Sequence, residues 1–267
     1  MRYFIKLSFN GSTFHGWQHQ PNASSVQAKI KEALTAILKE PVSVTGAGRT
    51  DAGVHARTFY AHFNCIRELE PEKITGLVYN LNGFISEDIT IHSIFPVKDD
   101  AHARFSAVLR TYQYVITRKK DPFLKSFSYY YAGKLDLAEM NAGALVLLQN
   151  TDFTSFAKTP TDSKSFICHL KEATWEEKDD LVIFTISADR FLRNMVRAIV
   201  GTLLELGRGK INLEEIQRII EKKDRCAAGF SVPAKGLFLT DIRYPEDIVL
   251  KSPDKQENSG QSSTSYR

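Results

Sequence analysis

Apolar residues recur along this chain with two different periods, and the order of these periods restricts the folds that it can adopt. Alternate positions of residues 2–9 are apolar, which is the pattern of a half-buried strand: Tyr3, Ile5, Leu7 and Phe9. The next segment has helical spacing, and Ser24 and Gln27 are placed as a capping box at its start. Its apolar stripe consists of Val26, Ile30, Ala33, Leu34 and Ile37.

The same two periods predict the remaining elements. Strands are expected at 41–45, 58–64 and 88–97, with a helix at 71–82. A second set of strands and helices starts near Arg104. Strands are expected at 105–118, twice within 165–188, and at 236–244. Helices are expected from Asp136, capped with Glu139, at 193–209, and at 213–223, capped by Asn212 and Glu215. We therefore predict an α+β protein of two similar halves with a cleft between them, divided into domains at 1–104 and 105–250.

Composition excludes several classes of protein. The 267 residues are 43% hydrophobic and 25% charged, as in a globular protein, and no run of about 18 apolar residues could cross a membrane. The N-terminus alternates too early to be a signal peptide, so we expect a cytoplasmic protein with no membrane partner. The cysteines are few, odd in number and far apart, which predicts buried thiols: Cys65, Cys168 and Cys226. Residues 251–267 are too polar to be buried and are predicted to form a disordered tail.

Positive charge is concentrated in two segments. The net charge is only +4, but residues 104–125 carry six basic side chains against Asp121 alone, and residues 190–210 carry five against Glu205 alone. Such segments are either ordinary solvated faces or the footprint of a polyanionic partner. The charges alone leave both interpretations open.

The segment Gly46–Arg57, GAGRTDAGVHAR, is the strongest candidate for a site. Asp51 lies on a loop between two expected strands, where a rigid scaffold can orient a side chain, and Arg49 and Arg57 would favour its ionised form. Glycines at 46, 48 and 53 let the backbone take positive φ angles and bring the chain close to a ligand. An ionised carboxylate held in place can act as a nucleophile or a base, whereas the same composition also suits a charged surface turn.

A metal site is an alternative chemistry, with Asp51, His55 and His62 as ligands. Their spacing matches no zinc pattern, and the flanking arginines would repel a dication, so no metal is predicted. The sequence also lacks a Walker loop, a dinucleotide-binding fingerprint and a Gly-x-Ser-x-Gly elbow.

Several motifs together resemble the tRNA pseudouridine synthase A family. The segment GAGRTDAGVHA is similar to the signature loop of that family, and further matches follow the order of the family: NGSTFHGWQHQP before it, then DAHARFSAVLRTYQYVI, DFTSFAK, FLRNMVRAIVGTLLELGRG and VPAKGLFLTDIRYP. These matches extend over nearly all of residues 1–245. The resemblance implies the pseudouridine synthase fold, with mixed, largely antiparallel sheets in two α/β-sandwich-like halves. It also implies isomerisation of uridine to pseudouridine in tRNA without a metal or any other cofactor.

The resemblance assigns roles to three residues. Asp51 matches the catalytic aspartate, which either attacks C1′ of the target uridine or removes the 2′ proton to give a glycal. Arg197 matches the arginine that pairs with this aspartate, and Tyr112 matches the tyrosine whose ring stacks on the uracil. Plainer interpretations remain: a helix arginine facing water for Arg197, and a core aromatic for Tyr112, which suits Tyr114 better.

Substrate contacts follow from the same resemblance, because a target nucleotide that leaves the base stack needs replacement contacts. Arg49 and Arg57 could supply phosphate contacts, and Phe14 and Trp17 could supply stacking, although packing explains Trp17 equally well. Leu237 could pack under the uracil, whereas an apolar strand residue is ordinarily part of the core.

The family acts as a homodimer on uridines at positions 38 to 40 of the anticodon stem-loop, so tRNA and a second copy of the chain are the expected partners. Two segments depart from the family pattern: Phe9-Asn10-Gly11 replaces the usual Tyr-Asp-Gly, and AAGFSVPAKG replaces the usual Gly-Pro-Thr-Ala-Pro lead-in. The competing functions are an RNA-binding module without catalysis, which aromatic strands and basic segments would serve equally well, and a metal-dependent hydrolase that uses Asp51 and the histidines.

Overall fold

The computed structural model describes residues 1–159 and 164–250, so the tail predicted at 251–267 lies outside the described residues. Within these ranges the strands are β1 (Arg2–Phe9), β2 (Val44–Gly46), β3 (His55–Asn64), β4 (Ile89–Val97), β5 (Leu109–Thr117), β6 (Tyr129–Tyr130), β7 (Leu170–Lys178), β8 (Leu181–Ala188) and β9 (Leu237–Arg243). The α-helices are α1 (Val26–Leu38), α2 (Pro71–Phe84), α3 (Leu137–Leu148), α4 (Met195–Gly207) and α5 (Leu213–Lys222). The expected α+β class is confirmed.

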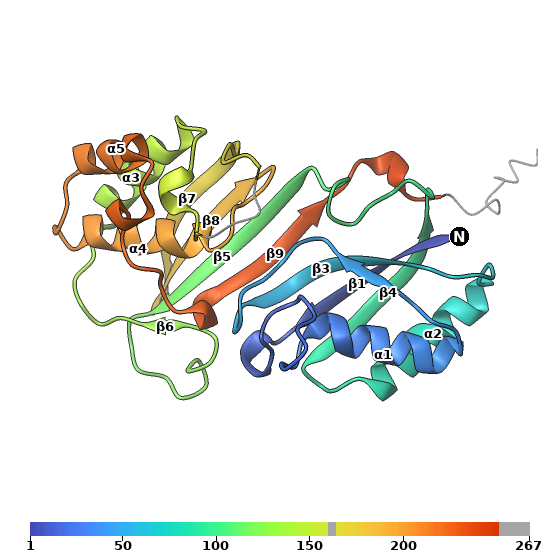
Figure 1. The fold of residues 1–267 in the computed structure, drawn as a ribbon. Coiled ribbons are helices and arrows are strands. Elements are labelled where there is room, and N and C mark those ends of the chain that lie inside the picture. The colour runs from blue at the N-terminus through green and yellow to red at the C-terminus, as the bar shows by residue number, and fades with distance from the viewer. Residues whose placement is uncertain (160–163, 251–267) are drawn as a thin grey trace, which may run out of the picture.

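One mixed sheet runs through the whole molecule. Its strand order is β4-β1-β3-β9-β5-β8-β7, with β2 paired to β3 and β6 paired to β5. The pairs β3–β9 and β5–β6 are parallel and the others are antiparallel, as the resemblance implies. Figure 1 shows β5 and β9 running side by side across the middle of the molecule, between the helices of the two halves. The two expected halves therefore share a continuous sheet.

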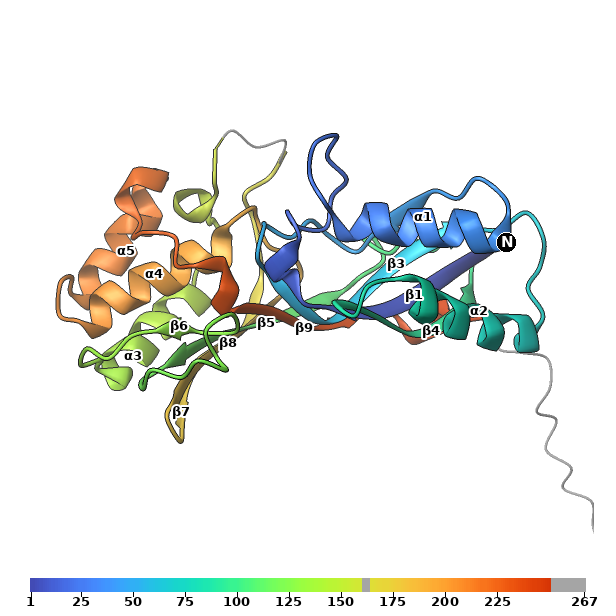
Figure 2. The same ribbon diagram turned by 90° about the horizontal axis from the view of Figure 1, so that it is seen from below.

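The strand β9 joins two hydrophobic cores. One core contains buried residues of α1, α2, β1 and β3, and the other contains those of α3, α4, α5, β5 and β8. Leu237 lies in the second core, whereas Leu239 and Ile242, further along the same strand, lie in the first. Helices α1 and α4 cover the same side of the central strands (Figure 2). Strand β9, the last strand within the described residues, thus contributes to both halves.

The edge of β3 that faces β9 is divided between two partners. β9 pairs with His55 and Ala56 only, and β2 pairs with residues 61–63 further along. Between these contacts the carbonyl of Tyr60 accepts from the backbone N–H of Ala47 at 2.8 Å, and the ring of Tyr60 lies 5.2 Å from that of Tyr244, after the end of β9. The loop that carries Asp51 connects β2 to the start of β3, beside the short parallel pairing.

Local sequence signals place most helix ends correctly. Asp136 accepts a hydrogen bond from the backbone N–H of Glu139, and Asn212 forms a complete capping box with Glu215. The prediction for α1 was wrong by one residue, because Ser25, not Ser24, accepts from the backbone N–H at the third helical position. Gln27 instead uses its amide to donate to the carbonyl of Val44, 2.7 Å away, which fixes α1 against β2.

The cysteine prediction holds for two of the three residues. Cys65 and Cys168 are buried free thiols, but Cys226 is exposed. Cys226 lies in a short 3-10 turn after α5, and its backbone N–H is bound by the side chain of Asp224. The turn is thus held by a backbone contact and the thiol does not need to be buried.

Candidate active site

The backbone of the Asp51 loop packs directly on the segment before α1. The backbone N–H of Trp17 donates to the hydroxyl of Thr50 at 3.0 Å, and the N–H of Gly53 donates to the carbonyl of Phe14 at 3.3 Å. Gly16 has a φ of +88°, and a Cβ on it would lie 2.2 Å from the carbonyl oxygen of Thr50. The motif FHGWQ therefore supports the loop that presents Asp51.

The glycines of the loop serve different purposes. Of these three glycines, only Gly53 has a positive φ, of +78°. A Cβ on Gly46 would lie 2.3 Å from the indole of Trp17, so this glycine provides space for a ring. No atom lies within 4 Å of a Cβ built on Gly48.

Phe14 and Trp17 lie inside the N-terminal core. Both side chains are buried, and the indole of Trp17 stacks on Phe59 with the ring centroids 4.3 Å apart. Because these rings are covered by protein, neither is accessible for stacking on an RNA base in this structure. Their role here is to hold the segment against which the Asp51 loop rests.

Asp51 forms an ion pair with Arg197 across the two halves. Arg197 lies in the first turn of α4, and its Nη1 donates to Oδ2 of Asp51 at 3.0 Å. The two side chains are 26% and 20% exposed respectively, so the guanidinium compensates a carboxylate that has lost most of its hydration. The Nε of Arg197 donates to the carbonyl of Val232 at 2.8 Å, and this second contact fixes the orientation of the guanidinium.

A segment of irregular backbone runs along α4 and supports Arg197. The backbone N–H of Val232 donates to the carbonyl of Arg197 at 3.2 Å, and the N–H of Gly229 donates to the hydroxyl of Thr202 at 2.8 Å. A Cβ on Gly201 would lie 1.8 Å from the carbonyl oxygen of Phe230, so only glycine allows this close approach. The segment AAGFSVPAKG, one of the two departures from the family pattern, thus lies directly against the helix that carries Arg197.

Tyr112 is placed at the junction of the two cores. It is partly buried, contacts both hydrophobic clusters and packs edge-on against Phe191 with the ring centroids 5.2 Å apart. Burial raises the pKa of Tyr112 to about 12, with the positive charge of Arg110 opposing this change and the negative charge of Asp51 adding to it. Among the described residues its hydroxyl has no hydrogen-bond partner, so a neutral phenol donor is left near Asp51.

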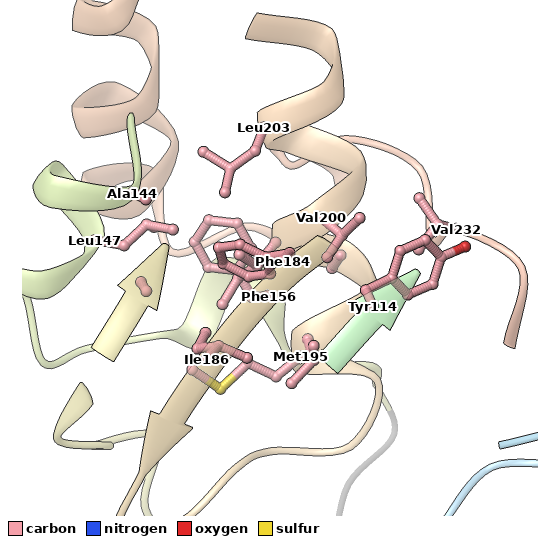
Figure 3. Packing of buried hydrophobic residues seen from close by; sticks show 14 of the residues in the cluster. Tyr114, Ala144, Leu147, Phe156, Phe184, Ile186, Met195, Val200, Leu203 and Val232 are labelled. Carbon is pink, nitrogen blue, oxygen red and sulfur yellow. The ribbon is translucent and has the colours of Figure 1, made fainter. Parts of the chain in front are cut away.

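Tyr114 and Leu237 belong to the C-terminal core. Tyr114 is fully buried and its hydroxyl donates to the carbonyl of Pro233 at 2.9 Å. Figure 3 shows its ring beside Val232 within that core. Leu237 is buried and pairs with Tyr114 in the β5–β9 register. The packing interpretation of Tyr114 is therefore confirmed, and Leu237 lies on the same face of the sheet as Tyr112 and Tyr114.

Arg110 is a site residue that the sequence patterns did not identify. Its guanidinium is surrounded by backbone carbonyls: Nη1 donates to Ala107 and Asp189, and Nη2 donates to Ala47 and Arg104. Burial lowers its pKa. The bond to Ala47, at 3.3 Å, connects this side chain to the start of the Asp51 loop. The signal in the sequence was an arginine two residues before Tyr112 within a predicted strand, because such residues lie on the same face of a sheet.

Arg49 and Arg57 take different positions around Asp51. Arg49 is exposed on the loop, two residues before the carboxylate. The guanidinium of Arg57 lies 5.3 Å from the ring centroid of Phe238. Phe238 alternates with Leu237 along β9, so Arg57 lies on the sheet face opposite to Leu237. There it lines a surface cavity of about 470 Å³ together with residues of β1, β4 and the loop before β4.

The histidines of the alternative metal site bind backbone groups. The Nδ1 of His55 accepts from the N–H of Gly11 at 3.1 Å, and its Nε2 contacts the carbonyls of Ser126 and Lys235. The Nδ1 of His62 accepts from the N–H of Ala103. Within residues 1–159 and 164–250, no group of three or more His, Cys, Asp or Glu side chains gathers in a way that could hold a metal ion. Among the helices that the structure describes, none combines the length and the apolar character needed to span a bilayer.

Comparison with known proteins agrees with the motifs and the fold. A family model described as tRNA pseudouridine synthase matches residues 147–245. The chain is 51% identical over 250 residues to tRNA pseudouridine synthase A of Parabacteroides distasonis, covering 92% of this chain and 97% of the relative. It is 49% identical over 257 residues to tRNA pseudouridine synthase A of Bacteroides thetaiotaomicron, covering 95% of this chain and 94% of the relative. With such identity along nearly its whole length, the chain belongs to the tRNA pseudouridine synthase A family.

Proposed function

We propose that this protein converts uridine to pseudouridine in tRNA and that Asp51 is the catalytic residue. The observation that carries the assignment of Asp51 is its ion pair with Arg197, which joins residues 146 positions apart and fixes a partly exposed carboxylate. A solvated surface turn would not need a partner from the other half of the molecule. Membership of the family supports the assignment of the reaction, and the ion pair supports the assignment of Asp51 as the reactive group.

The reaction conserves all atoms of the substrate and involves no oxidation or reduction. In one route, an oxygen of Asp51 attacks C1′ and the electron pair of the C1′–N1 bond leaves with the uracil. The uracil turns, C5 forms a bond to C1′ as the carboxylate departs, C5 loses its proton and N1 gains one. In the other route, the carboxylate removes the 2′ proton, a C1′–C2′ double bond forms and the uracil leaves with the electron pair of the C1′–N1 bond, which gives a glycal. The turned uracil then forms the C5–C1′ bond as the proton returns to C2′, after which C5 loses its proton and N1 gains one. Both routes need an ionised carboxylate at a fixed position.

The neighbours of Asp51 are proposed to serve that carboxylate and the base. Arg197 holds the carboxylate by charge and by its second bond to Val232. The ring of Tyr112 packs against the uracil, and its unpartnered phenol donates a hydrogen bond as the base turns. Leu237 supports this surface from the same sheet face. Arg49 binds a substrate phosphate, since it is exposed on the same loop as Asp51.

The wider partners are proposed from the family. The targets are uridines at positions 38 to 40 of the anticodon stem-loop, and the tRNA lies across two copies of the chain in the cytoplasm. The target uridine enters between the proposed domains 1–104 and 105–250, because Asp51 comes from the first and Tyr112 and Arg197 come from the second. Fewer basic residues are available for phosphates than the sequence counts indicate, since Arg110 is buried among carbonyls and Lys119 pairs with Asp180.

The catalytic assignment predicts that Asp51→Asn abolishes turnover while the fold and the affinity for tRNA stay nearly unchanged. We expect a fall in rate of about 10⁴-fold or more, as for other catalytic side chains. The measurement is pseudouridine formation in an unmodified tRNA transcript with EDTA present, followed by transcripts in which uridines 38, 39 and 40 are each replaced by cytidine.

Three other results would point elsewhere. Binding of tRNA without product in both proteins would favour an RNA-binding module. Hydrolysis that EDTA stops would favour a metal-dependent hydrolase. A large loss of thermal stability in Asp51→Asn would make the carboxylate a structural group.

A further inference from the structure

Phe105 is an aromatic side chain that the protein holds out in solvent. It lies between β4 and β5 in the segment 101–108, and 75% of it is exposed. The guanidinium of Arg104 lies 5.4 Å from the centroid of its ring, and the imidazole of His102 lies 4.4 Å from it. Single exposed apolar side chains are common on protein surfaces, so a contact at Phe105 is indicated by the cation beside the ring and by the attachment of this segment to the Asp51 loop.

The segment around Phe105 is rigid. The Nδ1 of His102 accepts hydrogen bonds from the backbone N–H groups of Arg104 and Phe105, and the carbonyl of His102 accepts from the N–H of Ser106 at 2.9 Å. The hydroxyl of Ser106 accepts in return from the N–H of His102. Ala103 is fixed on both sides, by His62 at its N–H and by the Tyr244 hydroxyl at its carbonyl. The ring is therefore displayed by a preorganised turn, and little ordering is needed on binding.

This turn is tied to the loop that carries Asp51. The Nη2 of Arg110 donates to the carbonyl of Arg104 at 2.5 Å and to the carbonyl of Ala47 at 3.3 Å, so one nitrogen bridges the two segments. Ala47 lies four residues before Asp51 in the same loop. The ring and the carboxylate thus belong to neighbouring loops that a single half-buried guanidinium connects.

We propose that Phe105 and Arg104 bind a nucleotide of the substrate RNA next to the target uridine, with the base stacked on the phenyl ring and its phosphate bound by the guanidinium. This proposal rests on the function proposed above. An aromatic ring with a cation beside it is the combination that binds unpaired nucleotides, since every base has a π face and every nucleotide carries a phosphate. A target uridine that leaves its stack exposes the face of the adjacent base, and Phe105 covers that face.

A second copy of the chain is the other molecule that could cover Phe105, because Val108 nearby is also 54% exposed. Arg104 favours the RNA, since a guanidinium fixed over the ring adds a positive charge that attracts a polyanion. These two partners can be distinguished by the mass of the protein in solution without RNA. Replacement of Phe105 would lower that mass only if the ring lies between two copies of the chain.

The experiment measures the Kd of an unmodified tRNA transcript and the single-turnover rate for full-length variants at Phe105. Stacking on aromatic residues predicts that Phe105→Ala raises Kd roughly 5- to 150-fold. Phe105→Tyr should stay within about 2-fold of the starting protein, because its ring still stacks, whereas Phe105→Leu should resemble the alanine variant. Arg104→Gln should lower the slope of log Kd against log salt by about one. Phe84→Ala, at a 52% exposed phenylalanine on α2, is the matched control and should change nothing.

Several outcomes overturn the proposal. An unchanged Kd in Phe105→Ala refutes it, and so does full activity of Phe105→Leu, which would show that any apolar group suffices. A shift of sedimentation from dimer to monomer in Phe105→Ala would place the ring in contact with a second copy. If the starting protein forms no pseudouridine, the proposed function fails, and the binding measurements still decide whether Phe105 contacts RNA.

Discussion

A carboxylate with limited access to water needs a fixed cation, and here Arg197 supplies it from the other half of the sheet. A nearby residue supports each partner of this ion pair. Thr50 holds the Asp51 loop, and Gly201 lets the backbone of Phe230–Val232 approach the helix of Arg197. The resemblance predicted that Asp51, Arg197 and Tyr112 act together, and the structure pairs Asp51 with Arg197 and places Tyr112 where the charge of Asp51 affects its pKa.

Replacement of Arg197 separates its charge from its geometry. We expect Arg197→Met to lower kcat on the order of 10²-fold with a smaller change in KM, because an oriented charge is lost next to the reacting group. The same change should lower the free energy of unfolding by about 1–3 kcal/mol, since Asp51 is left without its partner. Arg197→Lys retains the charge but not the bond to Val232, so its kcat should lie between that of the starting protein and that of Arg197→Met. Equal kcat in all three proteins would contradict a role at Asp51; the measurements are single-turnover kinetics and thermal unfolding.

Buried histidines make the fold sensitive to acid. Burial, with smaller contributions from the charge of Arg2 and from His102, lowers the pKa of His62 to about 4. The unfolded chain binds this proton below about pH 6.5, so the free energy of unfolding falls between pH 6.5 and 4, by roughly 3 kcal/mol from this residue, and is unaffected above that window.

His62→Asn tests this expectation, because the amide oxygen can replace Nδ1 as the acceptor for Ala103 but does not titrate. Denaturant unfolding at a series of pH values should show a flatter acid limb in this variant. His19→Asn, at an exposed loop position, should leave the pH dependence as it is. If the free energy of unfolding depended on pH with the same slope in all three proteins, His62 would not be the cause of the acid sensitivity.

At the scale of helices and strands, local signals in the sequence determined where helices begin. Contacts between residues distant in the sequence determined the order of the strands in the sheet. The cap at Asp136 and the box at Asn212 were predictable because each depends on residues three apart. The same rule selected Ser24, because Gln27 follows it by three residues, but the side chain of Gln27 binds the carbonyl of Val44 and the adjacent Ser25 caps α1. Nothing local marks β9 as the strand that lies between β3 and β5, because that position depends on residues from the other half.

The structure also explains why Asn10 suits its position in this chain. Its amide donates to the carboxylate of Asp88 at 2.9 Å, and its oxygen accepts from the N–H of Ser12, which starts the turn before Phe14. A carboxylate at residue 10 would face the carboxylate of Asp88. The departure from the family's Tyr-Asp-Gly therefore concerns the attachment of this loop to the segment before β4.

We predict that Asn10→Asp lowers the free energy of unfolding by about 1–2 kcal/mol, since a hydrogen bond to a charged group is replaced by repulsion. The double variant Asn10→Asp with Asp88→Asn exchanges the two groups and should recover most of this loss. Chemical denaturation of the single and double variants measures the difference. Recovery of less than half would mean that residue 10 is chosen for another reason.

At the scale of the whole molecule, the two halves are joined by a short parallel pairing and by Arg110. The side chain of Arg110 binds carbonyls from the Asp51 loop, the 104–107 turn and Asp189 at the end of β8. Its acceptors are all backbone groups, so no single partner residue marks this role in the sequence. The helices and the caps at Asp136 and Asn212 could be predicted, whereas the short pairing of β3 with β9 and the carbonyl contacts of Arg110 could not.

Arg110→Gln should destabilise the whole fold. Carbonyls that now bind a charged donor would lose it, and we expect the free energy of unfolding to fall by about 3 kcal/mol or more. Arg218→Gln is the matched control, because Arg218 is exposed on α5 and pairs only with Glu214 across one turn, where a loss of about 0.5 kcal/mol or less is expected. Equal effects of the two changes would show that Arg110 does not connect the halves.

The position of β9 has a consequence during synthesis. This strand is made last, yet it lies between β3 and β5 in the sheet. On the ribosome, the strand edges that it will cover therefore wait on the order of ten seconds after β5 has emerged. Open edges of this kind invite pairing with other nascent chains. A polypeptide that stops before Leu237 would leave the facing edges of β3 and β5 uncovered, so we expect it to aggregate and to be inactive.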